Sequence, residues 1–251
     1  MIQLDFISQR KIKDHVLGEI VVDDKKYSYK RGKPNNVNMI IERLASLVNI
    51  RCKHYDVAFI RGKRFNFNEI FSYDYCETFN SLGISCSTLN DIEKSLKELY
   101  LNLYAVLTIE LIKIYLFDIL TLNPGRTSNN IWVCYNGFND MDLLINHNNE
   151  AFSSLPMCGI SSYNYDLSCD VIPLVLSPLD DLDYFLSTTY PEYVEILKEM
   201  LRILTPERVL SVIDELEEEN KISIPLKEVY LERYRENYNR ILDMMFTRKR
   251  L

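Results

Sequence analysis

The residues best suited to chemistry gather in two polar stretches, each directly after an apolar segment. Residues 123–130 hold several asparagines and Arg126, and residues 147–150 hold two more asparagines, of which Asn148 is the first. An amide oxygen can ligate Mg²⁺, although hard cations favour the anionic oxygens of carboxylates. The acidic side chains beside these stretches are those of Asp140, Asp142 and Glu150. Metal chemistry here would therefore depend on amides and on these few acids.

Spacing disfavours several other kinds of site. The histidines are His15, His54 and His147, and no two of them have the spacing of zinc ligands on a helix. The six cysteines form no C-x-x-C pair, and neither the Rossmann nor the P-loop glycine motif occurs. We therefore expect no zinc site, and we expect the cysteines to remain thiols in a reducing compartment.

The first 75 residues predict strands and one clear helix. Residues 20–30 favour a hairpin, because β-branched and aromatic residues flank a polar Asp-Asp-Lys-Lys connection. Apolar residues recur every three or four positions over residues 36–49, which predicts a helix. Residues 55–60 and 64–67 predict two further strands around a turn.

The rest of the chain predicts helices interrupted by one hairpin. Residues 72–90 favour a connection, and an apolar stripe from Thr88 predicts a long helix that ends before the turn at residues 123–125. Residues 131–145 predict the hairpin. The remaining helices are expected over residues 179–186, 191–204, 206–219 and 226–246.

This order of elements predicts an α+β fold with two lobes. A small N-terminal lobe of residues 1–75 contains strands and one helix. A larger helical lobe of residues 76–251 carries both polar stretches within residues 117–152. The hinge is expected near residues 72–88, so that the two lobes share a cleft.

Residues 117–152 resemble the catalytic segment of HipA-like and phosphoinositide-kinase-like enzymes. That segment has the pattern N-x-D-R-x-x-x-N at the end of a long helix, then a hairpin, then a metal-binding aspartate. Here Asn123, Arg126 and Asn130 match the loop, and residues 148–152 resemble the motif D-N-E-x-x-F after the hairpin. The resemblance implies a two-lobed kinase fold, with ATP and Mg²⁺ as the cofactors.

The resemblance also implies roles for single residues. Lys30 looks like the strand lysine that holds nucleotide phosphates, and Glu42 looks like the acid that pairs with this lysine. Asn130 and Asn148 stand where the kinase fold holds the metal ions that neutralise the transferred phosphoryl group. The expected nucleotide-binding residues are therefore Lys30, Glu42 and Asn130, and the expected metal ligands are Asn130 and Asn148.

The chain departs from the kinase pattern at both catalytic carboxylates. Gly125 stands where a loop aspartate would orient the attacking hydroxyl, and Asn148 stands where an aspartate would ligate metal. Losing one well-placed electrostatic group costs about 10²–10³ in rate. We therefore expect a pseudokinase that binds ATP and Mg²⁺ weakly or not at all and acts on a protein partner. The resemblance implies a toxin–antitoxin or host-interaction setting.

Two other functions stay open. A divergent active Ser/Thr protein kinase would need a substitute carboxylate, for which Asp142 and Glu150 are the candidates. A scaffold that no longer binds nucleotide would keep the fold alone. The position of these carboxylates relative to Asn130 in a structure tests the first alternative. A measurement of nucleotide binding tests the second.

Charge and hydropathy limit the partners. The formal net charge is −7 and the pI is near 5.2, whereas nucleic-acid binding usually requires a basic surface. The longest apolar stretch, residues 99–122, is interrupted by polar residues and predicts a buried helix rather than a membrane span. The chain begins with Met-Ile-Gln-Leu-Asp rather than a basic and apolar leader, so we expect a cytoplasmic location.

Overall fold

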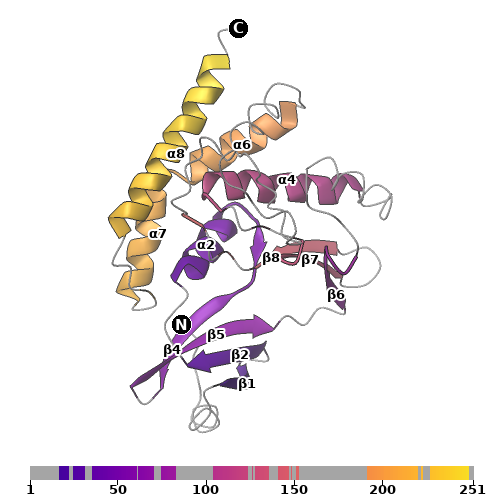
Figure 1. Cartoon of the computed structure of the whole chain (residues 1–251), viewed down its shortest axis with the longest axis vertical. Helices are drawn as coiled ribbons and strands as arrows, with labels where there is room; N and C mark the ends of the chain where they lie inside the picture. Colours follow the sequence, from indigo (N-terminus) through magenta and orange to yellow (C-terminus); the bar gives the residue numbers. More distant parts are fainter. Residues whose placement is uncertain are drawn as a thin grey trace, which may run out of the picture.

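The computed structural model in Figure 1 has a β-sheet at one end and a helical body with a second sheet at the other. It describes residues 17–22, 25–31, 36–60, 62–70, 75–82, 104–123, 126, 128–135, 141–146, 148, 151–152, 191–219, 222 and 227–248. These residues form two four-stranded sheets and five helices, which confirms the predicted α+β class. The lobe boundary between residues 75 and 76 stays a prediction.

The first sheet is antiparallel throughout and has the strand order β1-β2-β5-β4. Its strands are β1 (Leu17–Val22), β2 (Lys25–Arg31), β4 (Tyr55–Ile60) and β5 (Lys63–Ile70), which confirms the first predicted hairpin and the two strands after it. Successive side chains of a strand point to opposite faces, so one face collects apolar residues. That face buries a small core of Ile20, Val22, Tyr27, Tyr29, Ala58, Ile60, Phe65 and Phe67.

Helix α2 (Asn36–Leu47) lies between strands β2 and β4 in sequence and ends in a left-handed turn. Asn49 has a φ of 56°, and asparagine is one of the few residues that adopt this conformation at low cost. The N–H of Ile50 donates to the carbonyl of Ala45 at 2.9 Å. This is the six-to-one hydrogen bond of the Schellman motif, which closes a helix C-terminus. The predicted helix is confirmed, and the turn directs the chain toward the second sheet.

The second sheet has the strand order β3-β8-β7-β6. Strands β7 (Ile131–Tyr135) and β8 (Met141–Ile145) form the predicted second hairpin. The short strands β3 (Arg51–Cys52) and β6 (Tyr75–Thr78) were not predicted, and β6 interrupts the connection expected over residues 72–90. Strand β3 runs parallel to β8, so a segment from the first third of the chain is built into this sheet.

The register between β6 and β7 corrects the prediction for two cysteines. Cys76 lies directly opposite Cys134 in this antiparallel pair, and the two form a disulfide. The expectation that all six cysteines remain thiols is therefore wrong at this pair, because the pairing of distant strands is invisible to spacing. Cys52 is a free thiol. The other three, Cys86, Cys158 and Cys169, lie outside the described residues.

The helical body is formed by α4 (Tyr104–Leu120), α6 (Pro191–Ile203), α7 (Pro206–Glu218) and α8 (Lys227–Arg248). The last three helices are confirmed, whereas the helix expected over residues 179–186 and the first turns after Thr88 lie outside the described residues. Helix α4 packs inside the main core together with α2, the second sheet and the C-terminal helices. Among the described helices, none is long and apolar enough to cross a membrane.

Candidate functional site

The end of helix α4 delivers the first polar residues of the site. The backbone N–H of Asn123 donates to the carbonyl of Asp118 at 2.9 Å, and Leu122 has a φ of 55°. This is again the six-to-one hydrogen bond of a Schellman motif, here with a leucine in the left-handed region. The Asn123 side chain turns back so that Nδ2 donates to Asp118 Oδ1 at 2.9 Å. The helix end therefore orients a carboxylate that lies within the protein.

Arg126 forms a buried ion pair with this carboxylate. Its Nε donates to Asp118 Oδ2 at 2.8 Å and its Nη2 to Oδ1 at 2.9 Å, and both side chains are fully buried. The two bonds have the bidentate geometry that suits a planar guanidinium. Nη1 donates to the carbonyl of Asn146 at 2.8 Å, so each of the three guanidinium nitrogens has a partner. One negative and one positive charge thus cancel inside the site.

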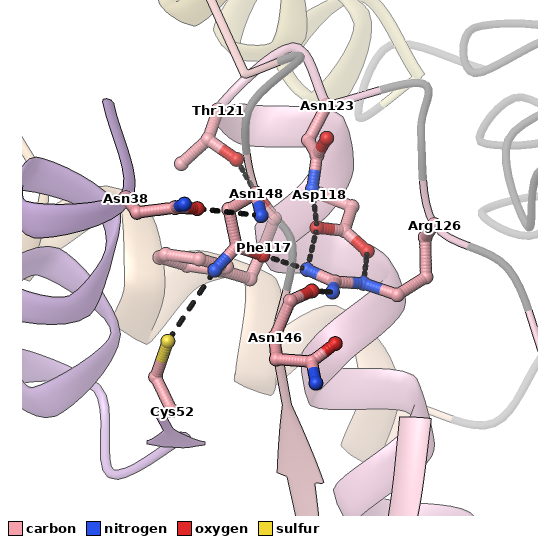
Figure 2. A network of polar contacts seen from close by, with 9 residues as sticks. All are labelled: Asn38, Cys52, Phe117, Asp118, Thr121, Asn123, Arg126, Asn146 and Asn148. Carbon is pink, nitrogen blue, oxygen red and sulfur yellow. Dashed lines mark hydrogen bonds and ion pairs between the residues drawn. The ribbon is translucent and has the colours of Figure 1, made fainter. Parts of the chain in front are cut away.

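Asn148 connects this pair to Asn38 and Cys52, as Figure 2 shows. Its Oδ1 accepts a hydrogen bond from Arg126 Nη2 at 2.6 Å, and its Nδ2 donates to Cys52 Sγ at 3.3 Å. Its backbone N–H donates to Asn38 Oδ1 at 2.7 Å. The residue is fully buried. It therefore joins α2, β3 and the polar loop, which are far apart in sequence.

The thiol of Cys52 is kept neutral at this junction. Burial raises its pKa to about 12, and the nearby carboxylate of Glu42 adds to this effect. A neutral thiol sulfur is a weak acceptor for the Asn148 amide. This contact fixes the orientation of that amide without adding a charge.

The segment after Asn148 is held by the C-terminal helix α8. The backbone N–H of Phe152 donates to the carbonyl of Thr121 at 2.9 Å, and Arg233 Nη1 donates to the carbonyl of Phe152 at 3.2 Å. The Phe152 ring stacks on Tyr230 with ring centroids 5.6 Å apart and meets Tyr234 edge-on at 6.2 Å. Phe152 thus anchors this segment, one position earlier than the motif D-N-E-x-x-F would put its phenylalanine.

Lys30 lies exposed on strand β2. It faces Asn66 across the β2–β5 pair, and Asn66 faces Val57 across the β5–β4 pair. Directly opposed residues of antiparallel strands share a face. Val57 belongs to the main core together with α2, so Lys30 lies on the face of the sheet that is turned toward this helix. This is the opposite face from the small aromatic core.

Glu42 has a different partner from the one the resemblance implied. Its Oε1 lies 2.7 Å from Nδ1 of His54, and its Oε2 accepts a longer hydrogen bond of 3.5 Å from the N–H of Tyr55. The carboxylate therefore ties α2 to the start of β4 instead of approaching Lys30. The structure brings Glu42 near Cys52, and no contact given for the described residues joins it to Lys30.

Asn130 lies at the base of the β7–β8 hairpin. Its carbonyl accepts a hydrogen bond from the N–H of Asn146 at 3.1 Å, which puts it two residues from Asn148 in the opposing strand. Gly125, the other degenerate position, lies outside the described residues. The structure therefore places Asn130 beside Asn146, two residues before Asn148.

The rival carboxylates are engaged elsewhere or lie outside the described residues. Asp142 forms an ion pair with Arg51 at 2.6 Å, between β8 and β3. Asp140 and Glu150 lie outside the described residues. Among the residues that the structure describes, no group of three or more histidine, cysteine, aspartate or glutamate side chains could hold a metal ion.

Sequence reasoning missed the residues that complete the network, namely Asn38, Cys52, Asp118 and Asn146. Asp118 carried a usable signal, because it is the single charged residue in the otherwise apolar last two turns of α4, residues 114–120. A charge in such a helix must be paired. The other three carried none, since their contacts depend on the packing of distant segments.

Comparison with known proteins agrees with this architecture. The sequence matches no protein-family model and no curated protein. The structure is similar to the Helicobacter pylori proinflammatory kinase CtkA, with a TM-score of 0.63 at 15% identity over 92% of this chain and 90% of that one.

A second similar structure is a chain from the Shewanella oneidensis MR-1 toxin–antitoxin complex of HipA, HipB and operator DNA. The TM-score is 0.56 at 12% identity, over 91% of this chain but 63% of that one. This chain thus spans less than two thirds of the length of that protein. At these identities the likeness establishes the fold and nothing finer. Two-lobed architecture, the position of the polar loop and both structural matches agree that the chain has the fold of the HipA-like kinases.

Proposed function

We propose that the chain is a pseudokinase of HipA-like fold, which binds a nucleotide and a protein partner and does not transfer phosphate. One observation carries the proposal. The residue at the metal-binding position of the fold is the neutral Asn148, and its oxygen accepts a hydrogen bond from Arg126. Gly125 stands at the loop position where the second carboxylate of the kinase pattern would be. Phosphoryl transfer depends on such groups for positioning and charge stabilisation.

A divergent active kinase that used Asp142 is less supported, because the register of the hairpin separates Asp142 from the loop; Glu150, the other candidate carboxylate, lies outside the described residues. Asn130 lies opposite residue 146, just beyond the Ile131–Ile145 pair. Asp142 lies four residues before position 146, near the start of β8. At roughly 3.3 Å per residue this separates the two positions by about 13 Å. A carboxylate at that distance, paired with Arg51, cannot replace the missing one without a rearrangement of the strand.

The protein partner is proposed from the second similar structure alone. That structure is a complex of HipA with HipB and operator DNA. We propose that this chain likewise acts through a bound protein, in a toxin–antitoxin or host-interaction setting. With a net charge of −7, the chain itself is a poor candidate for direct nucleic-acid contact.

A phosphotransfer assay tests the proposal. The wild-type chain is incubated with γ-labelled ATP, Mg²⁺ and a generic protein acceptor, and label is counted on the chain and on the acceptor. We expect no more label than with the Lys30→Ala variant, because two carboxylates that each contribute about 10²–10³ in rate are missing.

The matched control is Lys63→Ala, another exposed lysine of the same sheet on the opposite face. Label that is present with wild type and Lys63→Ala but lost with Lys30→Ala would refute the proposal. Such a result would establish an active kinase that uses the same cleft.

A further inference from the structure

We infer that a nucleotide in the cleft is bound without a divalent metal ion. The inference rests on the proposed nucleotide binding and concerns the chemistry of the same site. The kinase fold implies Mg²⁺ beside the phosphates, so the described residues are first tested as ligands for that ion.

The oxygen best placed for the metal is already engaged. Asn148 Oδ1 lies 2.6 Å from a nitrogen of the Arg126 guanidinium, and the residue is fully buried. A cation that approached this oxygen would meet another cation at contact distance. Turning the amide over would present Nδ2, a donor, and would break the contact with Cys52.

The carboxylate of Asp118 is engaged as well. Both oxygens of Asp118 accept hydrogen bonds from Arg126, and one also accepts a bond from Asn123. Its charge is cancelled by the guanidinium, and the side chain is fully buried. Because it is fully buried and paired with the guanidinium, it offers a metal ion no net negative charge.

Two further amide oxygens of the network belong to Asn123 and Asn146. Each is buried and accepts no hydrogen bond from the described residues. Both are neutral, and Figure 2 shows their side chains well apart, with the Asp118–Arg126 pair between them. They cannot share one ion, and hard divalent cations favour anionic oxygens. Asn130, the other expected ligand, is a neutral amide as well, so these described residues offer Mg²⁺ no free anionic oxygen and fit it poorly.

Without a metal, the phosphates must be neutralised by the protein. The pairing of Glu42 with His54 leaves Lys30 without a carboxylate partner in the described part of the chain, on the face of the sheet that is turned toward α2. A free ammonium on that face is the group that would take over the charge of the phosphates. Affinity for the nucleotide then depends on Lys30 and is independent of Mg²⁺.

Thermal unfolding of the intact chain tests this inference. The midpoint Tm is measured with and without millimolar ADP, once in EDTA and once in MgCl₂, with each nucleotide-free buffer as its own baseline. A ligand that binds the folded state alone must raise Tm. We expect the same ADP-dependent rise in both buffers, a reduced rise for Lys30→Ala, and an unchanged rise for Lys63→Ala.

The outcomes separate the two claims. A rise that requires Mg²⁺ overturns the inference and leaves the proposed nucleotide binding intact. No rise in either buffer overturns both and favours a scaffold. In Asn148→Asp the new carboxylate offers the metal an anionic oxygen, so Mg²⁺ should enlarge the rise. A folded variant with no response to Mg²⁺ would contradict the role assigned to this position.

Discussion

Replacing Asp118 by alanine is expected to lower the free energy of unfolding by about 3–5 kcal/mol, because a fully buried Arg126 would lose its counter-charge. Two of the bonds that satisfy the guanidinium disappear, and no solvent reaches the site. The measurement is urea unfolding followed by circular dichroism, with the midpoint and the slope fitted separately.

Helix α4 offers a matched control in Glu110, which pairs with Lys113 one turn away at 2.6 Å. Both side chains of that pair are partly exposed, so Glu110→Ala should cost at most about 1 kcal/mol. Both variants remove one paired carboxylate from the same helix, and the two sites differ chiefly in burial. Equal losses for the two variants would show that the Asp118–Arg126 pair does not hold the loop.

Replacing Phe152 by alanine should cost a similar amount, about 3–5 kcal/mol, which is typical for removing a buried aromatic ring. Phe152 is 1% exposed and packs between Tyr230 and Tyr234 of helix α8. The alanine would leave a cavity between this helix and the loop, because the surrounding rings are themselves fixed by packing. Thermal and urea unfolding of the same samples measure the loss.

Phe59→Ala is the control for the second variant. This ring on β4 is 53% exposed and lies against the guanidinium of Arg64 at 5.6 Å. An exposed cation–π contact contributes about 0.5–1 kcal/mol, which sets the expected loss. If Phe152→Ala were no more harmful than Phe59→Ala, the segment after Asn148 would not depend on α8.

The elements with a local signal were predictable. The hairpin over β1 and β2 was visible in its β-branched and aromatic runs, and α2 was visible in its apolar periodicity. Pro191 and Pro206 marked helix starts, where the missing N–H costs nothing. Each of these features is decided by residues within one or two turns of chain.

Features that depend on distant pairing were not predictable. Strand β3 is two residues long and exists because it pairs with β8, more than 90 positions later. The Cys76–Cys134 disulfide depends in the same way on the register of β6 against β7. No local pattern encodes either one, and short strands carry too few residues for an alternation to appear.

At the candidate site, the sequence indicated the positions and missed the partners. Asn148 was singled out for lacking a charge, but its hydrogen bonds to Arg126, Cys52 and Asn38 could not be read from spacing. Glu42 was expected beside a lysine and lies beside His54, because the orientation of α2 on the second sheet decides which side chain it reaches. Tertiary packing sets these contacts.

The central claim is that the metal-binding position of this kinase fold no longer binds metal. A co-crystal with ADP and Mn²⁺, with diffraction recorded at the manganese edge, tests it most directly. We expect ADP density between Lys30 and Asn130 and no manganese peak within ligand distance of Asn148 Oδ1. A manganese ion coordinated by that oxygen, with Arg126 displaced from it, would contradict the account.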